Sequence, residues 1–255
     1  GDSEDLDPFD DAIAAIAPDF SSVVDQIVND EFELDSVEDN LALWLDASNI
    51  NGSNNIGIEN ADNIAKWIDL SGSKKHAIQS DEDKQPLFVQ ANNAIEFNGS
   101  DFVMQTGTLE LDSDQMTIIA IAKLDSSERS SLQSIVGLMN NNHHLFFGSK
   151  DFNFASFYGD GSSWGVEAAE NKKAIRITGD FAVLTSIQNG MDHAFVNGLA
   201  QNAESNLMVA PGNSKVYIGD SSSQNEFWDG QIREILIFDR GLTTEEHQKV
   251  LYYLG

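Results

Sequence analysis

The chain has 255 residues, and its 42 acidic residues against 14 basic ones give a formal net charge of −28. Such a surface repels nucleic acid and anionic lipid, and it suits salty solvent or the binding of divalent cations. The absence of cysteine excludes a disulfide framework and thiolate metal sites. No run approaches the roughly 18 apolar residues of a membrane span, so we expect no membrane insertion.

Residues 1–40 differ in pattern from the rest of the chain. Asp7 and Pro8 form a helix-start signal, and Val23 and Ile27 belong to a stripe of apolar residues at helical spacing. We predict one or two amphipathic helices here, as an N-terminal extension that either packs on the following domain or links it to a preceding one. The start at Gly1 rather than Met indicates a segment excised from a longer chain, and we expect the module to be monomeric.

From Leu41 onward, short runs rich in β-branched and aromatic residues alternate with turns of Gly, Asn, Ser and Asp. Asn189-Gly190 is a strong hairpin signal between two such runs, and Asn197-Gly198 closes the next turn. Many short strands with regular turns are typical of an antiparallel sandwich, so we predict an all-β fold. The clearest predicted strands are Met116–Leu124, Ser134–Met139, His144–Gly148, Phe152–Tyr158, Ala174–Thr178, Phe181–Gln188, Met191–Val196, Lys215–Gly219 and Gly230–Phe238.

The chain closes with a predicted helix. Thr243 as N-cap and Glu246 three residues later form a capping box. Val250, Leu251 and Leu254 follow at helical spacing, so we expect them to face the sheet.

Three segments, in order along the chain, carry a resemblance to a known family. They are LALWLDAS at 41–48 with WIDLSG at 67–72, AIEFNGSDFV at 94–103, and FWDGQIREILIFDR at 227–240. Together they resemble the concanavalin A-like lectin/glucanase superfamily in its bacterial laminin-G-like branch, and in particular the ligand-binding modules of large calcium-dependent, RTX-type bacterial adhesins. The resemblance implies a two-sheet antiparallel jelly-roll sandwich over residues 41–255, with the first and last strands adjacent.

The strand pattern also assigns faces to particular side chains. Phe97 lies between the polar residues Glu96 and Asn98, and we predict that both Phe97 and Trp44 face the core. Ile232, Ile235 and Ile237 supply the apolar side of the last strand, and their spacing indicates an irregularity near position 234.

The resemblance implies a structural calcium ion between the turn after the Phe-Asn-Gly strand and the last strand. This carries over to Asn98, Asp101 and Glu234. The chain departs from the family pattern in having Arg233 where relatives often carry an acid, and Asn98 in place of a common Asp. Other acid-bearing turns hold Asp220 and Asp229. The alternative is that these side chains cap the backbone of their own turns.

Two loops are candidates for the ligand site. The first holds Asn142, His143 and His144. The second holds Tyr158 and Asp160, and places Trp164 among small residues, where little local core is available to it. An aromatic side chain rimmed by polar groups is typical of a binding site. The alternative is that this tryptophan folds back over a sheet edge. Trp228, by contrast, matches an aromatic position of the last strand, and we interpret it as structural.

No strand carries two or three alternating acids on one face, as a glycosidase of this superfamily would, so we predict no catalysis. Proteins of this fold include lectins, peptide binders and lyases. We therefore predict a calcium-dependent, lectin-like module of an extracellular bacterial surface adhesin, attaching to glycans on a cell or surface. The alternatives are a peptide- or protein-binding module, a structural spacer, and a polysaccharide lyase or hydrolase, for which Tyr158, Arg176, Gln188 and His193 could supply polar groups.

Overall fold

A computed structural model describes residues 37, 39–111, 114–125, 133–138, 143–147, 154–157, 180–189, 192–200, 212–221 and 226–255, with the backbone alone for 143–147, 154–157 and 192. The helices predicted within residues 1–36 and the strand predicted at 174–178 lie outside the described residues. Residues 37–255 form one compact unit.

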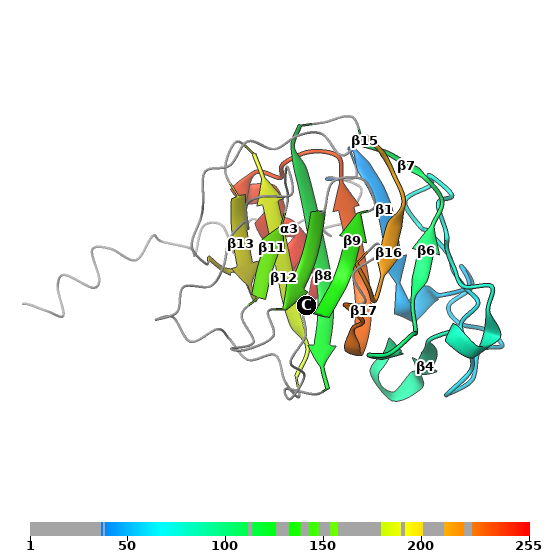
Figure 1. The fold of residues 1–255 in the computed structure, drawn as a ribbon. Helices are drawn as coiled ribbons and strands as arrows, with labels where there is room; N and C mark the ends of the chain where they lie inside the picture. The colour runs from blue at the N-terminus through cyan, green and yellow to red at the C-terminus, as the bar shows by residue number, and fades with distance from the viewer. Residues whose placement is uncertain are drawn as a thin grey trace, which may run out of the picture. The chain divides into compact units, whose positions relative to one another are not determined.

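The described strands build two large antiparallel sheets that face each other (Figure 1). The strand order of the first sheet is β14 (Leu199–Ala200), β13 (Asp192–Val196), β12 (Ala182–Gln188), β8 (Met116–Leu124), β17 (Asp229–Phe238), β5 (Ala94–Asn98) and β4 (Leu87–Val89). β1 (Leu41–Asp46) pairs with the second half of β17, so the first and last strands are adjacent, as predicted.

The second sheet covers the inner face of the first. Its order is β11 (Phe154–Phe157), β10 (His143–Phe147), β9 (Gln133–Leu138), β16 (Val216–Ile218), β6 (Met104–Thr106), β3 (Ala77–Ile78) and β2 (Lys66–Trp67). A small sheet of β15 (Gly212–Ser214) and β7 (Leu109–Leu111) and the short 3-10 turns η2 (Ala47–Asn49), η3 (Glu82–Lys84) and η4 (Gln90–Asn92) complete the sandwich. The predicted two-sheet antiparallel jelly-roll fold is therefore confirmed.

The core lies between the two large sheets. Trp67, Phe97 and Trp228 are almost completely buried in it, which confirms the structural role predicted for Trp228. On β17, Ile232, Ile235 and Ile237 are buried in the same core. All three can face the core because the register with β8 shifts between positions 232 and 234. This shift is the irregularity that the spacing predicts.

The prediction that Trp44 faces the core is wrong. Its neighbours Leu43 and Leu45 take the core positions of β1, and the Trp44 ring points to the outer face, where its edge meets Tyr253 at a centroid distance of 6.1 Å. The neighbours of Trp44 in β1 are leucines and not polar residues, and both faces of the strand are covered. An aromatic residue is therefore stable on either face of β1, and the alternation of side chains along the strand does not decide which face it takes.

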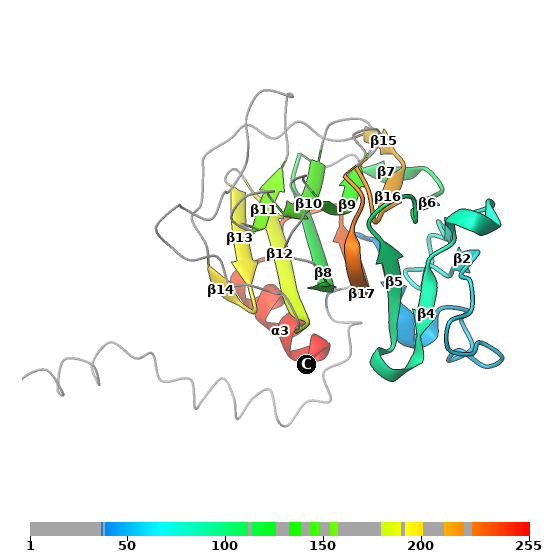
Figure 2. The ribbon, with the colours of Figure 1, turned by 60° about the horizontal axis from the view of Figure 1, so that its bottom comes forward.

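The cover on the outer face is helix α3 (Thr244–Leu254), which lies across the first sheet beside β12 and β13 (Figure 2). Its capping box forms as predicted, because the Thr243 hydroxyl accepts from the Glu246 N–H at 3.2 Å and the Glu246 carboxylate accepts from the Thr243 N–H at 2.8 Å. Among the described residues, no helix has the length and apolarity needed to cross a membrane.

Candidate functional site

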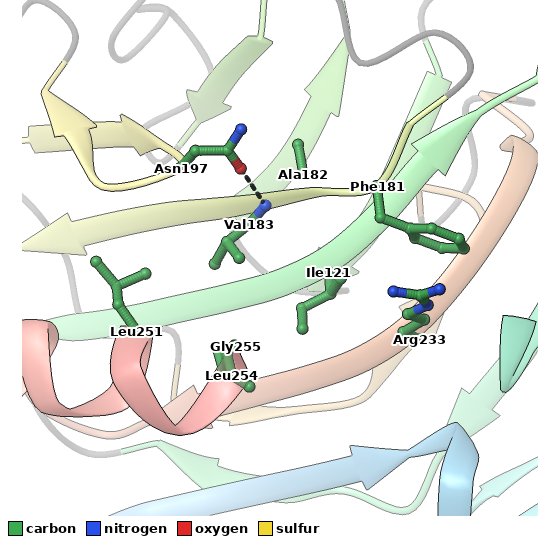
Figure 3. A pocket seen from close by; sticks show the side chains of 9 residues that line it. All are labelled: Ile121, Phe181, Ala182, Val183, Asn197, Arg233, Leu251, Leu254 and Gly255. Atoms are coloured by element: carbon green, nitrogen blue, oxygen red, sulfur yellow. Dashed lines mark hydrogen bonds between the residues drawn. The ribbon is translucent and has the colours of Figure 1, made fainter.

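The irregularity in β17 brings a charged side chain to the outer face of the first sheet. A bulge adds one residue to a strand, so that two successive side chains leave the regular alternation. Here the register shift between Ile232 and Glu234 leaves Arg233 projecting outward, with its guanidinium beside the Phe181 ring (Figure 3).

Arg233 lines a pocket of about 370 Å³ at the end of this helix. The walls are apolar side chains from β8, β12 and α3, and the polar groups are Arg233 and the amide of Asn197, from the turn between β13 and β14. The lining residues are Ile121, Phe181, Ala182, Val183, Asn197, Arg233, Leu251, Leu254 and Gly255.

The guanidinium of Arg233 is held in place by two contacts. Its central carbon lies 3.7 Å from the centroid of the Phe181 ring, and its Nε donates to the carbonyl of Asn92 at 2.8 Å. These two contacts use the flat face and the Nε of the guanidinium, and they leave its two Nη nitrogens unused. Among the described residues, no acceptor is bound to either Nη nitrogen. Burial lowers the pKa of Arg233, but a guanidinium keeps its proton in proteins. The pocket therefore holds a fixed positive charge.

The other polar groups near the pocket are placed by local structure. Asn197 takes a left-handed conformation in the predicted Asn-Gly turn, with φ of 50°, and its Oδ1 accepts from the N–H of Val183 at 2.8 Å (Figure 3). That bond occupies the amide oxygen of Asn197, a residue that also lines the pocket. Lys123 lies 5.6 Å from the Phe181 centroid and pairs with Asp125 at 3.1 Å, so its charge is balanced.

Glu234, next to Arg233 on the bulge, is engaged elsewhere. Its Oε1 accepts a 2.8 Å hydrogen bond from Nε1 of Trp44, and its cross-strand neighbour is Asp46. Burial, and then the negative charge of Asp46, raise the pKa of Glu234 to about 8. The carboxyl is therefore largely protonated at neutral pH and does not neutralise Arg233.

Three of the predicted metal ligands meet at one end of the first sheet. Asn98 of β5 pairs across the strands with Asp229 of β17. The Asn98 Oδ1 accepts from the backbone N–H groups of Ser100, Asp101 and Phe102, and its Nδ2 donates to Asp101 Oδ1 at 2.7 Å. These bonds are those of a side chain that caps its own turn.

The other two predicted metal ligands are Glu234 and Asp220. Glu234 is five residues further along β17 than Asp229, which is about 16 Å at the usual rise of a strand. Asp220 accepts from the N–H groups of Ser221 and Glu226, and burial raises its pKa to about 6. Within the described ranges, no three His, Cys, Asp or Glu side chains form a group that could hold a metal ion. Calcium binding remains a prediction.

The predicted ligand loops are mostly beyond what the structure describes. Asn142, Tyr158, Asp160 and Trp164 lie outside the described residues. His143 and His144 open β10 and pair with Leu138 and Gly137 of β9, and only their backbone is described.

The pocket itself was missed from the sequence. Arg233 was noted only as a departure from the family's acid, and Phe181 only as the start of a strand. The available signal was a lone arginine inside an apolar strand at a predicted irregularity.

Solved structures with a similar fold include a sialidase and toxin domains. Trypanosoma rangeli sialidase aligns with a TM-score of 0.58 and 13% identity over 83% of this chain and 32% of the sialidase chain. The ligand-binding domain of botulinum neurotoxin serotype D, solved with N-acetylneuraminic acid, aligns with a TM-score of 0.60 and 14% identity over 86% of this chain and 52% of the toxin chain. At such identities the likeness shows the fold.

The receptor-binding domain of the mosaic serotype C/D toxin gives a similar result, with a TM-score of 0.60 and 15% identity over 85% of this chain and 51% of the toxin chain. The chain thus spans about a third of the sialidase and about half of each toxin domain. A comparison with curated protein sequences finds no match.

Residues 97–246 match the profile of the concanavalin A-like lectin/glucanases superfamily, which is more than half of the chain. The matched region runs from the core residue Phe97 through both large sheets to the capping box of α3. The profile and the jelly-roll architecture agree, and this chain belongs to the concanavalin A-like lectin/glucanases superfamily.

Proposed function

We propose that this chain is a non-catalytic, lectin-like module that binds a glycan in the pocket at the end of α3. The observation that carries the proposal is the Arg233 guanidinium, which is stacked at 3.7 Å on Phe181 and lines the pocket with both Nη nitrogens unused by the described residues. A ligand pocket usually combines apolar walls with a few fixed polar groups, and this pocket has both.

The comparisons support a sugar as the ligand. The superfamily is named for its lectins and glucanases, and a toxin domain of similar fold was solved with N-acetylneuraminic acid. The low identity to that domain transfers no contact residue to this chain.

The lining of the pocket favours binding over catalysis. General acid–base catalysis needs a titratable side chain within hydrogen-bond reach of the substrate. Among the described residues, the side chains that line the pocket include no Asp, Glu, His, Tyr or Lys. A sugar held there would meet hydrogen-bond donors and apolar walls, but no group able to exchange a proton near neutral pH.

We further propose that the module works outside a bacterial cell, as part of a surface adhesin, and that it needs calcium. The net charge of −28 and the absence of cysteine support this setting. The turn with Asn98 and Asp101 lies beside Asp229 of the last strand, and the family resemblance implies a calcium ion between this turn and that strand. A bound ion there would stiffen the end of the sheet.

A glycan array probed with the full chain, in calcium and again in chelator, tests the proposal. We expect a defined set of glycans to bind, with binding lost in Arg233→Ala and reduced in chelator. Lys84→Ala is the matched control, because it removes one positive charge from the exposed turn η3. Equal loss in both variants would place the site elsewhere. A blank array with a positive peptide array would replace the lectin with a peptide-binding module, and blanks on both would leave a structural spacer.

A further inference from the structure

We infer that the sugar bound at this pocket is a carboxylated one, recognised through its carboxylate by Arg233. The inference rests on the proposed glycan-binding function and names the ligand class. It follows from the geometry of the guanidinium, from the charges around it, and from the shape of the remaining pocket.

The first argument is the orientation of the guanidinium. The contacts with Phe181 and with the Asn92 carbonyl use the flat face and the Nε of Arg233. The part that remains is the pair of Nη nitrogens. A planar guanidinium matches a carboxylate with two parallel N–H···O bonds, and a guanidinium already fixed in place loses little freedom when those bonds form.

The second argument is charge. Arg233 has no ion pair with any described residue, since the neighbouring acid Glu234 is bound to Trp44 and Asp125 is paired with Lys123. A partly buried charge without a counter-ion is unfavourable, and a single carboxylate from the ligand would balance it. This local positive charge stands out in a chain with a net charge of −28.

The third argument is the shape of the pocket. Ile121, Val183 and Leu251 form an apolar wall suited to the C–H face of a sugar ring. A volume of about 370 Å³ is near the lower end of the ~300–1,000 Å³ usual for ligand pockets, so the site suits one sugar unit. The two coplanar Nη donors of a single guanidinium fit a singly charged planar carboxylate better than a tetrahedral sulfate, which offers acceptors in more directions.

The experiment is a calorimetric titration of the full chain with three sugars: glucuronate, galacturonate and N-acetylneuraminate. Each acid is compared with its methyl ester, which keeps the ring and removes the charge, and galactose 6-sulfate is the anionic control. At least one acid should bind about tenfold or more tightly than its ester and than the sulfate. Arg233→Gln should abolish that preference. Arg233→Lys should keep the charge but weaken binding, because lysine lacks the planar pair of donors. Lys84→Gln should leave the preference intact.

Melting curves check that each variant is folded. The outcomes of the titration distinguish a failure of carboxylate recognition from a failure of the proposed glycan-binding function. Esters that bind as tightly as their acids, an equal affinity for the sulfate, or a preference that survives in Arg233→Gln would overturn carboxylate recognition and leave the lectin function standing. If the array and the titrations detect no sugar, both proposals fail together.

Discussion

The indole Nε1 of Trp44 donates a 2.8 Å hydrogen bond to Oε1 of Glu234, and so links the first strand of the sandwich to the last. The Glu234 side chain is nearly buried, and Asp46 is its cross-strand neighbour. A carboxyl in such a place is more stable protonated than charged, which is why its pKa is raised to about 8.

Glu234 should make the fold less stable as the pH rises. Its pKa is higher in the folded chain, at about 8, than the ordinary 4.5, so its contribution is full below pH 4.5 and is lost as the pH rises toward 8. Glu234→Gln keeps an acceptor for Trp44 and carries no charge. We expect the variant to melt at a higher temperature than the wild type at pH 8.5 and to differ little at pH 4.5. A constant difference across this range would contradict the assignment.

Gly219 should tolerate no side chain, for a reason beyond its backbone conformation. Its φ is +82°, and a Cβ there would collide with the ring of Phe97, which is buried and cannot move aside. Gly72 has a φ of +86° and open space around the same position. Gly72→Ala should therefore lose about 1 kcal/mol of unfolding free energy from strain alone, and Gly219→Ala at least about 2 kcal/mol more from overpacking. Urea denaturation of both variants measures the difference, and equal losses would refute the collision.

Thr243 should stabilise α3 through its hydroxyl. The oxygen accepts from the Glu246 N–H at 3.2 Å, and the Glu246 carboxylate also pairs with Arg240 at 2.9 Å. Thr243→Ala should lower the free energy of unfolding by about 1 kcal/mol, the usual loss for an N-cap. Thr243→Ser retains the oxygen and should stay close to the wild type in the same urea denaturation. Similar losses in the two variants would point to the lost methyl group instead.

The elements of the fold were predictable because their signals are local. Met116–Leu124 forms β8 with the predicted bounds, and β17 begins one residue before the predicted Gly230. Runs of β-branched residues and Asn-Gly turns act within a few positions, so a sequence reveals them directly. The same holds for the capping box at Thr243.

The candidate site was not predictable because its contacts are distant along the chain. Arg233 stacks on Phe181, 52 positions earlier, and bonds to Asn92, 141 positions earlier. No periodic pattern encodes such pairs. The face taken by Trp44 was misjudged for a related reason, since the helix that covers it begins about 200 residues later.

His247 should remain neutral well below the pH at which a histidine normally gains a proton. Its ring is buried between Thr185, whose hydroxyl lies 3.1 Å from Nε2, and Phe195, at a centroid distance of 4.6 Å. Burial lowers the pKa of His247 to about 4, from an ordinary 6.5. The stability it contributes is therefore full above pH 6.5 and is lost as the pH falls toward 4, which is the opposite of the effect of Glu234. In NMR spectra, we expect the His247 Hε1 shift to stay constant from pH 7.5 to 5 and to titrate near pH 6.5 only after unfolding in urea. A midpoint near 6.5 in the folded chain would mean that water reaches the ring and that α3 does not seal this face of the sheet.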